Sequence, residues 1–298
     1  MKCIFAIIAF VVTALIPDLA HAWGPGVHLA LGNSVLADIG CLPPLVAALL
    51  DRHRNAFLYG CLSADIFIGK GTNFRPGHSH NWVTGFKLLN SAKEARVLAY
   101  GYGYLTHLAA DVVAHNYFVP NALMDMNSGS KLSHVYVEAQ ADRNFRREQE
   151  TALSLFRRPN RDSDDTLLSA MDKRRFPFVV KKQILKGSLT VTGRKTWGTS
   201  LRLADRLLPG PRVNRHLDEM FTLSQNIIFD FLADPKASPA VSFDPIGSGN
   251  LRRVRDIRIK RQAGALIPSI KFQPHESLTD IASPVIHTAP SFGATVGG

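Results

Sequence analysis

Three residues that commonly bind divalent metals follow one another at four-residue intervals: His107, Asp111 and His115. In an α-helix, positions four apart return to within about 40° of each other, so all three would lie on one stripe. At a rise of ~1.5 Å per residue, the two histidines would be about 12 Å apart along the axis. One zinc ion with ligand bonds near ~2 Å could not easily hold both, whereas the two oxygens of the middle carboxylate could bridge separate metals. The spacing therefore favours a multi-metal cluster over a mononuclear site.

A second histidine–acid pair repeats this spacing. His134 and Glu138 are also four residues apart, on what the sequence predicts to be the next helix, where they could form the opposite wall of the site. A single histidine on an apolar helix is more often a core residue than a ligand, but two consecutive helices with such pairs favour a shared site. Eleven histidines against three cysteines favour imidazole and carboxylate ligands over thiolates. Further candidate ligands are His28, Asp65, and either His80 or His78, which compete for one place.

The segments that carry these residues have helical patterns. Ser91-Ala92-Lys93-Glu94 has the spacing of a capping box, and the apolar, low-proline run behind it continues to Pro120. Within this run, Gly101 and Gly103 are expected to allow close packing of a neighbouring helix. Strand-like alternation is scarce, and residues 188–192 are the one tempting run. Other helices are expected from Pro44 and over residues 131–150, 163–173, 196–208 and 213–233. The sequence thus predicts an all-α fold, a single helical-bundle domain over residues 23–234.

Both ends of the chain depart from this pattern. Lys2, the apolar stretch 4–16 and Ala20-His21-Ala22 have the order of a secretory signal peptide, so residues 1–22 are expected to be removed and the protein to be secreted or periplasmic. Residues 235–298 are rich in Pro, Ser and Gly around a basic run, and are expected to form an irregular basic C-terminal arm, extended or partly disordered. Two cysteines, Cys41 and Cys61, follow the signal, and the sequence leaves open whether they form a disulfide.

The composition excludes several classes of protein. The chain has 298 residues, of which 46% are apolar and 20% charged, as in a folded protein and unlike a disordered or fibrous chain. Three cysteines are too few for a disulfide scaffold or a cysteine-based zinc finger. Lys and Arg number 35 against 24 Asp and Glu, which gives a formal charge of +11. That charge suits an anionic membrane surface and a nucleic acid equally well.

Together, these motifs resemble those of the bacterial zinc-dependent phospholipases C, a family that also supplies the catalytic domain of glycosylphosphatidylinositol-specific phospholipase D. The resemblance covers residues 23–148, and its order and residue types together are specific, although each part alone is weak. It implies an all-α fold with up to three zinc ions in one cleft. The motifs that carry it are Trp23, His28, Ala64-Asp65-Ile66-Phe67, His80-Asn81-Trp82, the 107/111/115 stripe and the 134/138 pair.

The resemblance implies three ligand sets. The first is Asp65, His80, His107 and Asp111. The second is His115, His134 and Glu138. The third is His28, Asp111 and the free α-amine and carbonyl of Trp23, which becomes available only when the signal is removed. Asp111 would thus have the bridging role that the spacing favours independently.

The implied activity is that of a secreted phospholipase C, which cleaves a phospholipid to diacylglycerol and a phosphorylated head group. Such a protein would contact membranes peripherally and is expected to be a monomer. Clustered zinc ions suit this reaction because they lower the pKa of bound water from about 15.7 towards ~7 and neutralise charge on the phosphoryl oxygens. Asp65 would act as general base or serve as a ligand alone. Two alternatives stay open: a zinc-dependent nuclease for single strands, and a zinc-stabilised binding or structural module without turnover.

Overall fold

The computed structural model describes residues 23–67, 78–126, 137, 139–192, 213–268 and 270–284. Every regular element among these residues is a helix, so the predicted all-α class is confirmed. No helix in these ranges is long and apolar enough to cross a bilayer. The elements are α2 (Pro25–Ala37), η1 (Ile39–Cys41), α3 (Pro44–Arg52), α4 (Arg54–Ser63), η2 (Ala64–Ile66), α5 (Trp82–Ser91), α6 (Ala95–Val113), η3 (Ala114–Phe118), α7 (Val119–Met124), α9 (Arg146–Arg157), α10 (Arg161–Met171), α11 (Arg175–Thr192), α13 (Val213–Ala233), η4 (Pro239–Ser242), α14 (Ser248–Gln262) and α15 (Glu276–Thr279).

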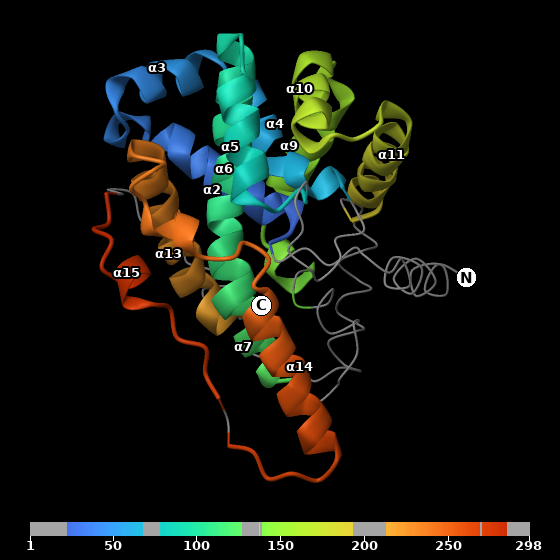
Figure 1. Cartoon of the computed structure of the whole chain (residues 1–298), viewed down its shortest axis with the longest axis vertical. Helices are drawn as coiled ribbons and strands as arrows, with labels where there is room; N and C mark the ends of the chain where they lie inside the picture. The colour runs from blue at the N-terminus through green and yellow to red at the C-terminus, as the bar shows by residue number, and fades with distance from the viewer. Residues whose placement is uncertain are drawn as a thin grey trace, which may run out of the picture.

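Helix α6 forms the centre of the bundle, with α4, α5, α2 and α13 packed around it (Figure 1). Its closest neighbour is α4, because glycines face each other where the two helices cross. A Cβ added to Gly103 would overlap the carbonyl oxygen of Phe57, and one added to Gly60 would overlap that of Tyr100. On another side, Gly101 faces Leu89 of α5. The expectation that Gly101 and Gly103 allow close helix packing is therefore confirmed.

The long apolar run that was predicted as one helix changes its hydrogen bonding near its end. Helix α6 begins at Ala95, and Glu94 precedes it as an N-cap whose side chain makes no capping hydrogen bond. The predicted capping box is therefore wrong, since Ser91 ends α5. After Val113 the chain continues as a π-helix, η3, in which hydrogen bonds join residues five apart. This wider turn carries His115.

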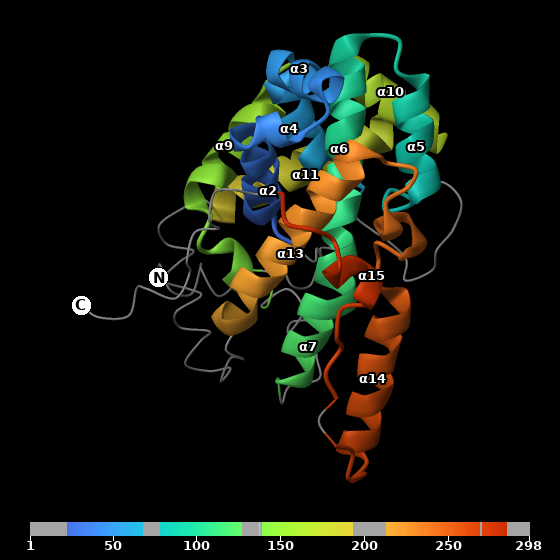
Figure 2. The same ribbon diagram turned by 90° about the vertical axis from the view of Figure 1, so that its left-hand side faces the viewer.

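The C-terminal arm is more regular than the sequence predicts. Its basic run forms helix α14, which packs against η3 and α7, and both views show α14 beside α7 (Figure 2). The arm is also fastened to helices of the bundle. The Trp82 indole donates a hydrogen bond to the carbonyl of Phe243 at 2.9 Å, and the Asn121 side chain exchanges two hydrogen bonds with the backbone of Phe272 at 2.8 and 2.9 Å.

Other sequence expectations have mixed outcomes. Helix α13 has the predicted bounds, and the strand-like run 188–192 lies inside α11. Cys41 and Cys61 are both free thiols, which answers the open question of a disulfide. The proposed signal segment 1–22 and the predicted helix 196–208 lie outside the described residues, as does most of the loop between Asp65 and His80.

Candidate metal centre

Five candidate ligands from four separate segments converge in the core. Asp65 lies in the η2 turn after α4, His80 lies just before α5, His107 and Asp111 lie on α6, and His28 lies on α2. The exposed fraction of each is 2% or less. Burial of so many ionisable side chains is costly unless they are paired or bind a metal, so their convergence marks a site.

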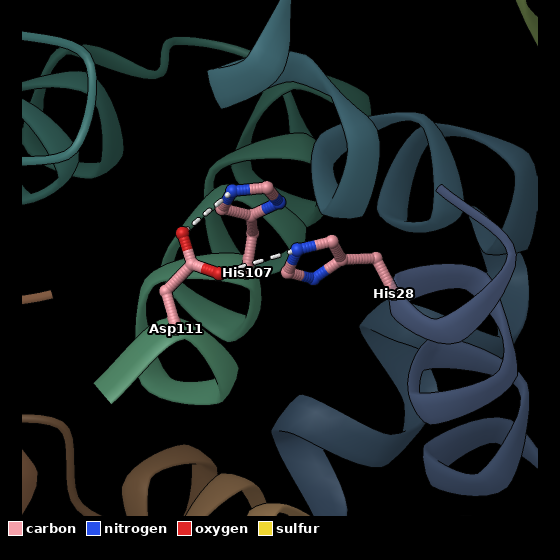
Figure 3. Close-up of side chains that lie close together, drawn as sticks. All are labelled: His28, His107 and Asp111. Atoms are coloured by element: carbon pink, nitrogen blue, oxygen red, sulfur yellow. Dashed lines mark ion pairs between the residues drawn. The ribbon is translucent and has the colours of Figure 1, made fainter. Parts of the chain in front are cut away.

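Asp111 occupies the middle of this cluster. Its Oδ1 atom is 3.3 Å from Nε2 of His28, and its Oδ2 atom is 3.2 Å from Nε2 of His107 (Figure 3). The Oδ2 atom also lies 3.1 Å from Nε2 of His80. The two oxygens of this carboxylate therefore face different imidazoles. That is the geometry a bridging carboxylate requires. The spacing of the stripe predicts a bridge between His107 and His115, but both of these face Oδ2, and it is His28 that faces Oδ1.

Hydrogen bonding fixes the orientation of the His107 ring in the cluster. Its Nδ1 atom is 2.8 Å from the carbonyl oxygen of Cys61, which can only accept, so Nδ1 carries the hydrogen. In the neutral ring Nε2 is then a lone pair. It faces Nε2 of His80 at 3.0 Å and the acceptor oxygen of Asp111. His80 in turn has its Nδ1 2.9 Å from the Ser79 hydroxyl. These imidazole nitrogens and carboxylate oxygens, with hydrogen bonds behind the rings, form a set of ligand atoms of the kind found in zinc sites.

The contact between His28 and Asp111 also joins two possible ligand atoms. The two facing atoms are buried, and neither makes a hydrogen bond of good geometry across their 3.3 Å separation. Burial, and then the neighbouring His107, lower the pKa of His28 to about 4, so its ring is neutral at neutral pH. Burial alone would raise the pKa of Asp111, but the facing histidines, His107 foremost, lower it well below its ordinary value. Ionised carboxylate and neutral imidazole are the forms that bind metal.

The residues present fit zinc. In two groups, His28–His107–Asp111 and Asp65–His80–His107, the possible ligand atoms lie within 4.8 Å of one another. Tetrahedral ligands with bonds of about 2.0–2.1 Å lie roughly 3.3 Å apart, which is close to the separations found around Asp111. Because Nδ1 of His107 is occupied, this ring offers one nitrogen and can join only one of the two groups. Asp111 belongs to the first group and also lies 3.1 Å from His80 of the second.

Trp23, the expected N-terminal ligand, packs against helix α6 next to Asp111. Its indole is fully buried, donates to the carbonyl of Ala110 at 3.2 Å and packs on Phe118 with ring centroids 4.5 Å apart. The start of α2 is held next to it by Asp142, whose Oδ1 accepts a hydrogen bond of 2.9 Å from the backbone N–H of Val27. Trp23 is thereby fixed beside the residue that precedes Asp111.

The second half of the metal-binding stripe is held differently. His115 lies on the π-helix with its Nε2 3.8 Å from Oδ2 of Asp111, and belongs to neither three-residue group among the described residues. The C-terminal arm contacts its backbone. Gly247, at φ 62°, lies so close to the His115 carbonyl that a Cβ would overlap it. Asn116 donates to the carbonyl of Asp244 at 2.8 Å and accepts from Asn250 at 2.8 Å.

His134 and Glu138, the remaining predicted ligands, lie outside the described residues, so the sets that include them stay predictions. Between the two competing histidines, the structure places His80 in the cluster. Nδ1 of His78 instead accepts a hydrogen bond of 3.1 Å from the backbone N–H of His80.

Sequence reasoning missed the groups that orient the ligands. Tyr104 donates a short hydrogen bond to the carbonyl of Ser79, next to His80. Asn81 accepts from the N–H of Val83 at 2.8 Å and so starts α5. An asparagine before a helical run is a recognisable N-cap signal, but nothing in the sequence marks the Cys61 carbonyl or the hydroxyl of Tyr104.

A comparison with families of known proteins agrees with this geometry. A sequence model described as zinc dependent phospholipase C matches residues 27–184, more than half of the chain. The chain belongs to the zinc-dependent phospholipase C family. Searches of curated proteins and of solved structures give no match. The matched residues of this phospholipase C family member include all five converging ligands, and end before α13 and the C-terminal arm.

Proposed function

We propose that the protein is a secreted or periplasmic, zinc-dependent phospholipase C that acts as a monomer and holds up to three zinc ions. It would cleave the phosphodiester of a phospholipid to diacylglycerol and a phosphorylated head group. The observation that carries the proposal is the buried carboxylate of Asp111, whose two oxygens face separate imidazoles in a chain of this family. When bound, zinc ions would activate water and neutralise charge on the phosphoryl oxygens.

The side chains have distinct tasks in this reaction. In the first ligand set, His80, His107 and Asp111 would hold the metal, and the Ser79 hydroxyl and the Cys61 carbonyl back the two imidazoles. Asp65 has its Oδ1 3.3 Å from Nε2 of His80, and can accept the proton of the attacking water. The water oxygen would bond to phosphorus, the bond from phosphorus to the glycerol oxygen would break, and that oxygen would take the proton accepted by Asp65 to leave as diacylglycerol.

Nuclease activity is the second candidate because of helix α14. Ser248–Gln262 carries six basic side chains and one acid, which would suit a polyanion. A chain beginning at Trp23 should be assayed with a chromogenic phosphocholine ester and with single-stranded DNA, before chelation, after it, and after zinc is restored. The proposal expects zinc-dependent cleavage of the ester alone. Cleavage of DNA alone would replace it with the nuclease, and bound zinc without either activity would indicate a binding module.

The N-terminal ligand has its own test. An extra residue before Trp23 converts the α-amine into an amide, which is a poor zinc ligand, so the extended chain should bind zinc more weakly and lose turnover. The same residue added at the C-terminus is the control and should change neither property. Full activity and zinc content in the N-terminally extended chain would show that Trp23 is not a ligand.

A further inference from the structure

Helix α11 has apolar residues on two opposite faces. Phe178, Leu185 and Leu189 are each 2% exposed and pack into the core. On the other side, Phe176, Val179, Val180 and Ile184 are 80%, 43%, 44% and 42% exposed. At 100° per residue these four side chains span about 140° of the helix circumference, directly opposite the buried three. We call these four residues the outer face of α11.

The outer face is unusual within this protein. Single exposed apolar side chains are normal on a soluble surface. Among the described residues, the other large exposed ones are Leu45, Val83, Ile259 and Leu266, on four different segments. Half of the exposed large hydrophobic side chains therefore gather on α11 alone, which indicates a surface for contact with an apolar partner.

The charged residues of helix α11 itself are all basic. Helix α11 contains Arg175, Lys181, Lys182 and Lys186 and no acidic residue, and two more cations, at positions 173 and 174, precede it. At 100° per residue, Lys181 and Lys186 lie just beyond the two edges of the outer face. Lys182 is committed to Asp164, at 2.6 Å, and Arg175 to Asp165. Flanking lysines on flexible stems can keep their charge in a head-group layer while the apolar stripe is buried.

The position of α11 connects this face to the metal centre. Phe178 on its inner side packs against Phe67, with ring centroids 5.5 Å apart, and Phe67 follows the η2 turn that carries Asp65. Figure 1 shows α11 at one edge of the described part of the molecule, away from α3 and α14. A surface that contacts α11 from outside is thus one helix away from the turn that holds a metal ligand.

We propose that the protein docks on an anionic bilayer through the outer face of α11, with the apolar side chains entering the head-group boundary and the lysines contacting anionic lipid. The bilayer is chosen over an apolar protein groove because lysines flank both edges of the outer face and helix α11 carries no acidic residue. The proposal rests on the proposed phospholipase function for its biological meaning, but binding itself requires no turnover.

The test compares two double variants of the full zinc-loaded chain in vesicle flotation. Phe176→Ser/Val180→Ser removes two of the four apolar side chains of the outer face, and Leu45→Ser/Leu266→Ser removes two even more exposed side chains elsewhere. With equimolar phosphatidylcholine and phosphatidylglycerol, the first variant should bind at least about tenfold more weakly than wild type, and the control within about twofold. Binding should also fall on phosphatidylcholine alone and at raised salt. Equal loss in both variants, or no loss in the first, would overturn the proposal.

Two parallel measurements separate the possible failures. Hydrolysis of the soluble phosphocholine ester should be unchanged in Phe176→Ser/Val180→Ser, since neither side chain is part of the metal centre. Absent hydrolysis with α11-dependent vesicle binding would refute the proposed function and keep the docking surface. Gel filtration supplies the other arm: a wild-type dimer that the α11 variant dissociates would assign the face to a second copy of the chain and overturn bilayer docking.

Discussion

The two ends of the stripe of candidate metal ligands, His107 to His115, are built in different ways. His107 and Asp111 lie on regular α-helix, fully buried, where backbone meets backbone at Gly103 and Gly60. His115 lies on a π-helix and is held from outside, by side-chain hydrogen bonds between Asn116 and the C-terminal arm. One end therefore depends on core packing, and the other on a segment beyond the residues that match the family.

Because of this difference, substitutions near the two ends should have different consequences. Contact between helix backbones cannot relax locally, so damage near His107 should affect the whole fold. A side-chain hydrogen bond contributes only about 1 kcal/mol, so damage near His115 should stay local and affect one metal position.

The largest effect is expected at the carboxylate between the two ends. Asp111→Asn keeps the shape of the side chain but removes its charge from both the His28 and the His80–His107 sides. We expect the variant to lose more than one zinc ion per chain and its kcat to fall at least about 100-fold. Substitution of a group that only hydrogen-bonds to a ligand should cost less. His115→Ala, the comparison, should lose at most one ion. Elemental analysis of purified proteins measures this, and a loss of one ion or fewer in Asp111→Asn would contradict the bridging role.

The second effect tests the packed end of the stripe. Gly103→Ala adds a Cβ that overlaps the carbonyl of Phe57, so α4 and α6 must separate along the wall that holds Asp65 and His107. The free energy of unfolding should fall by about 3 kcal/mol or more. Gly187→Ala on α11 is the matched control, because nothing lies within 4 Å of its added Cβ. Thermal unfolding compares the two, and an unchanged melting temperature in Gly103→Ala would refute backbone contact at this crossing.

The same contrast separates what the sequence could predict from what it could not. Local periodicity places His107 and Asp111 on one stripe and predicts α13 to the residue, because both lie in regular helix. The π-helix has no local signal: it depends on contacts with the arm, more than a hundred residues away, such as that of Asn116 with Asp244. The sequence predicts the basic run to be irregular because charged residues dominate it. Only two of its apolar residues, Val254 and Ile257, are buried where α14 packs on the bundle.

The third effect concerns how stability depends on acid pH. Two buried groups, His28 and Asp142, have pH dependences of opposite sign. In the metal-free chain the pKa of His28 is lowered from 6.5 to about 4, so its contribution to stability is present above pH 6.5 and is lost as the pH falls towards 4. For Asp142, burial raises the pKa to about 6, which the hydrogen bonds from Val27 and Gln149 only partly offset. Its contribution is present below pH 3.8 and is lost as the pH rises through 6. Each amounts to about 3 kcal/mol.

Asp142→Asn should therefore unmask the His28 effect. The variant no longer gains stability on acidification, so its free energy of unfolding should fall more steeply than that of wild type between pH 6.5 and 4. Urea titrations of chelated protein across this range measure the difference. Asp256→Asn, at an exposed site on α14, should leave the slope unchanged. Parallel pH profiles for Asp142→Asn and wild type would show that Asp142 carries no such linkage.

The smallest effect is expected where the arm holds the π-helix. Asn250→Ala removes the 2.8 Å hydrogen bond to the carbonyl of Asn116 and leaves the metal centre itself untouched. We expect a loss of about 1 kcal/mol in the free energy of unfolding and weaker binding of one zinc ion only. Competition with a chromogenic chelator resolves that ion, and Arg252→Ala, exposed on the same helix, is the control. Equally weaker binding of every zinc ion would mean that the arm stabilises the whole bundle, so that both ends of the stripe depend on it.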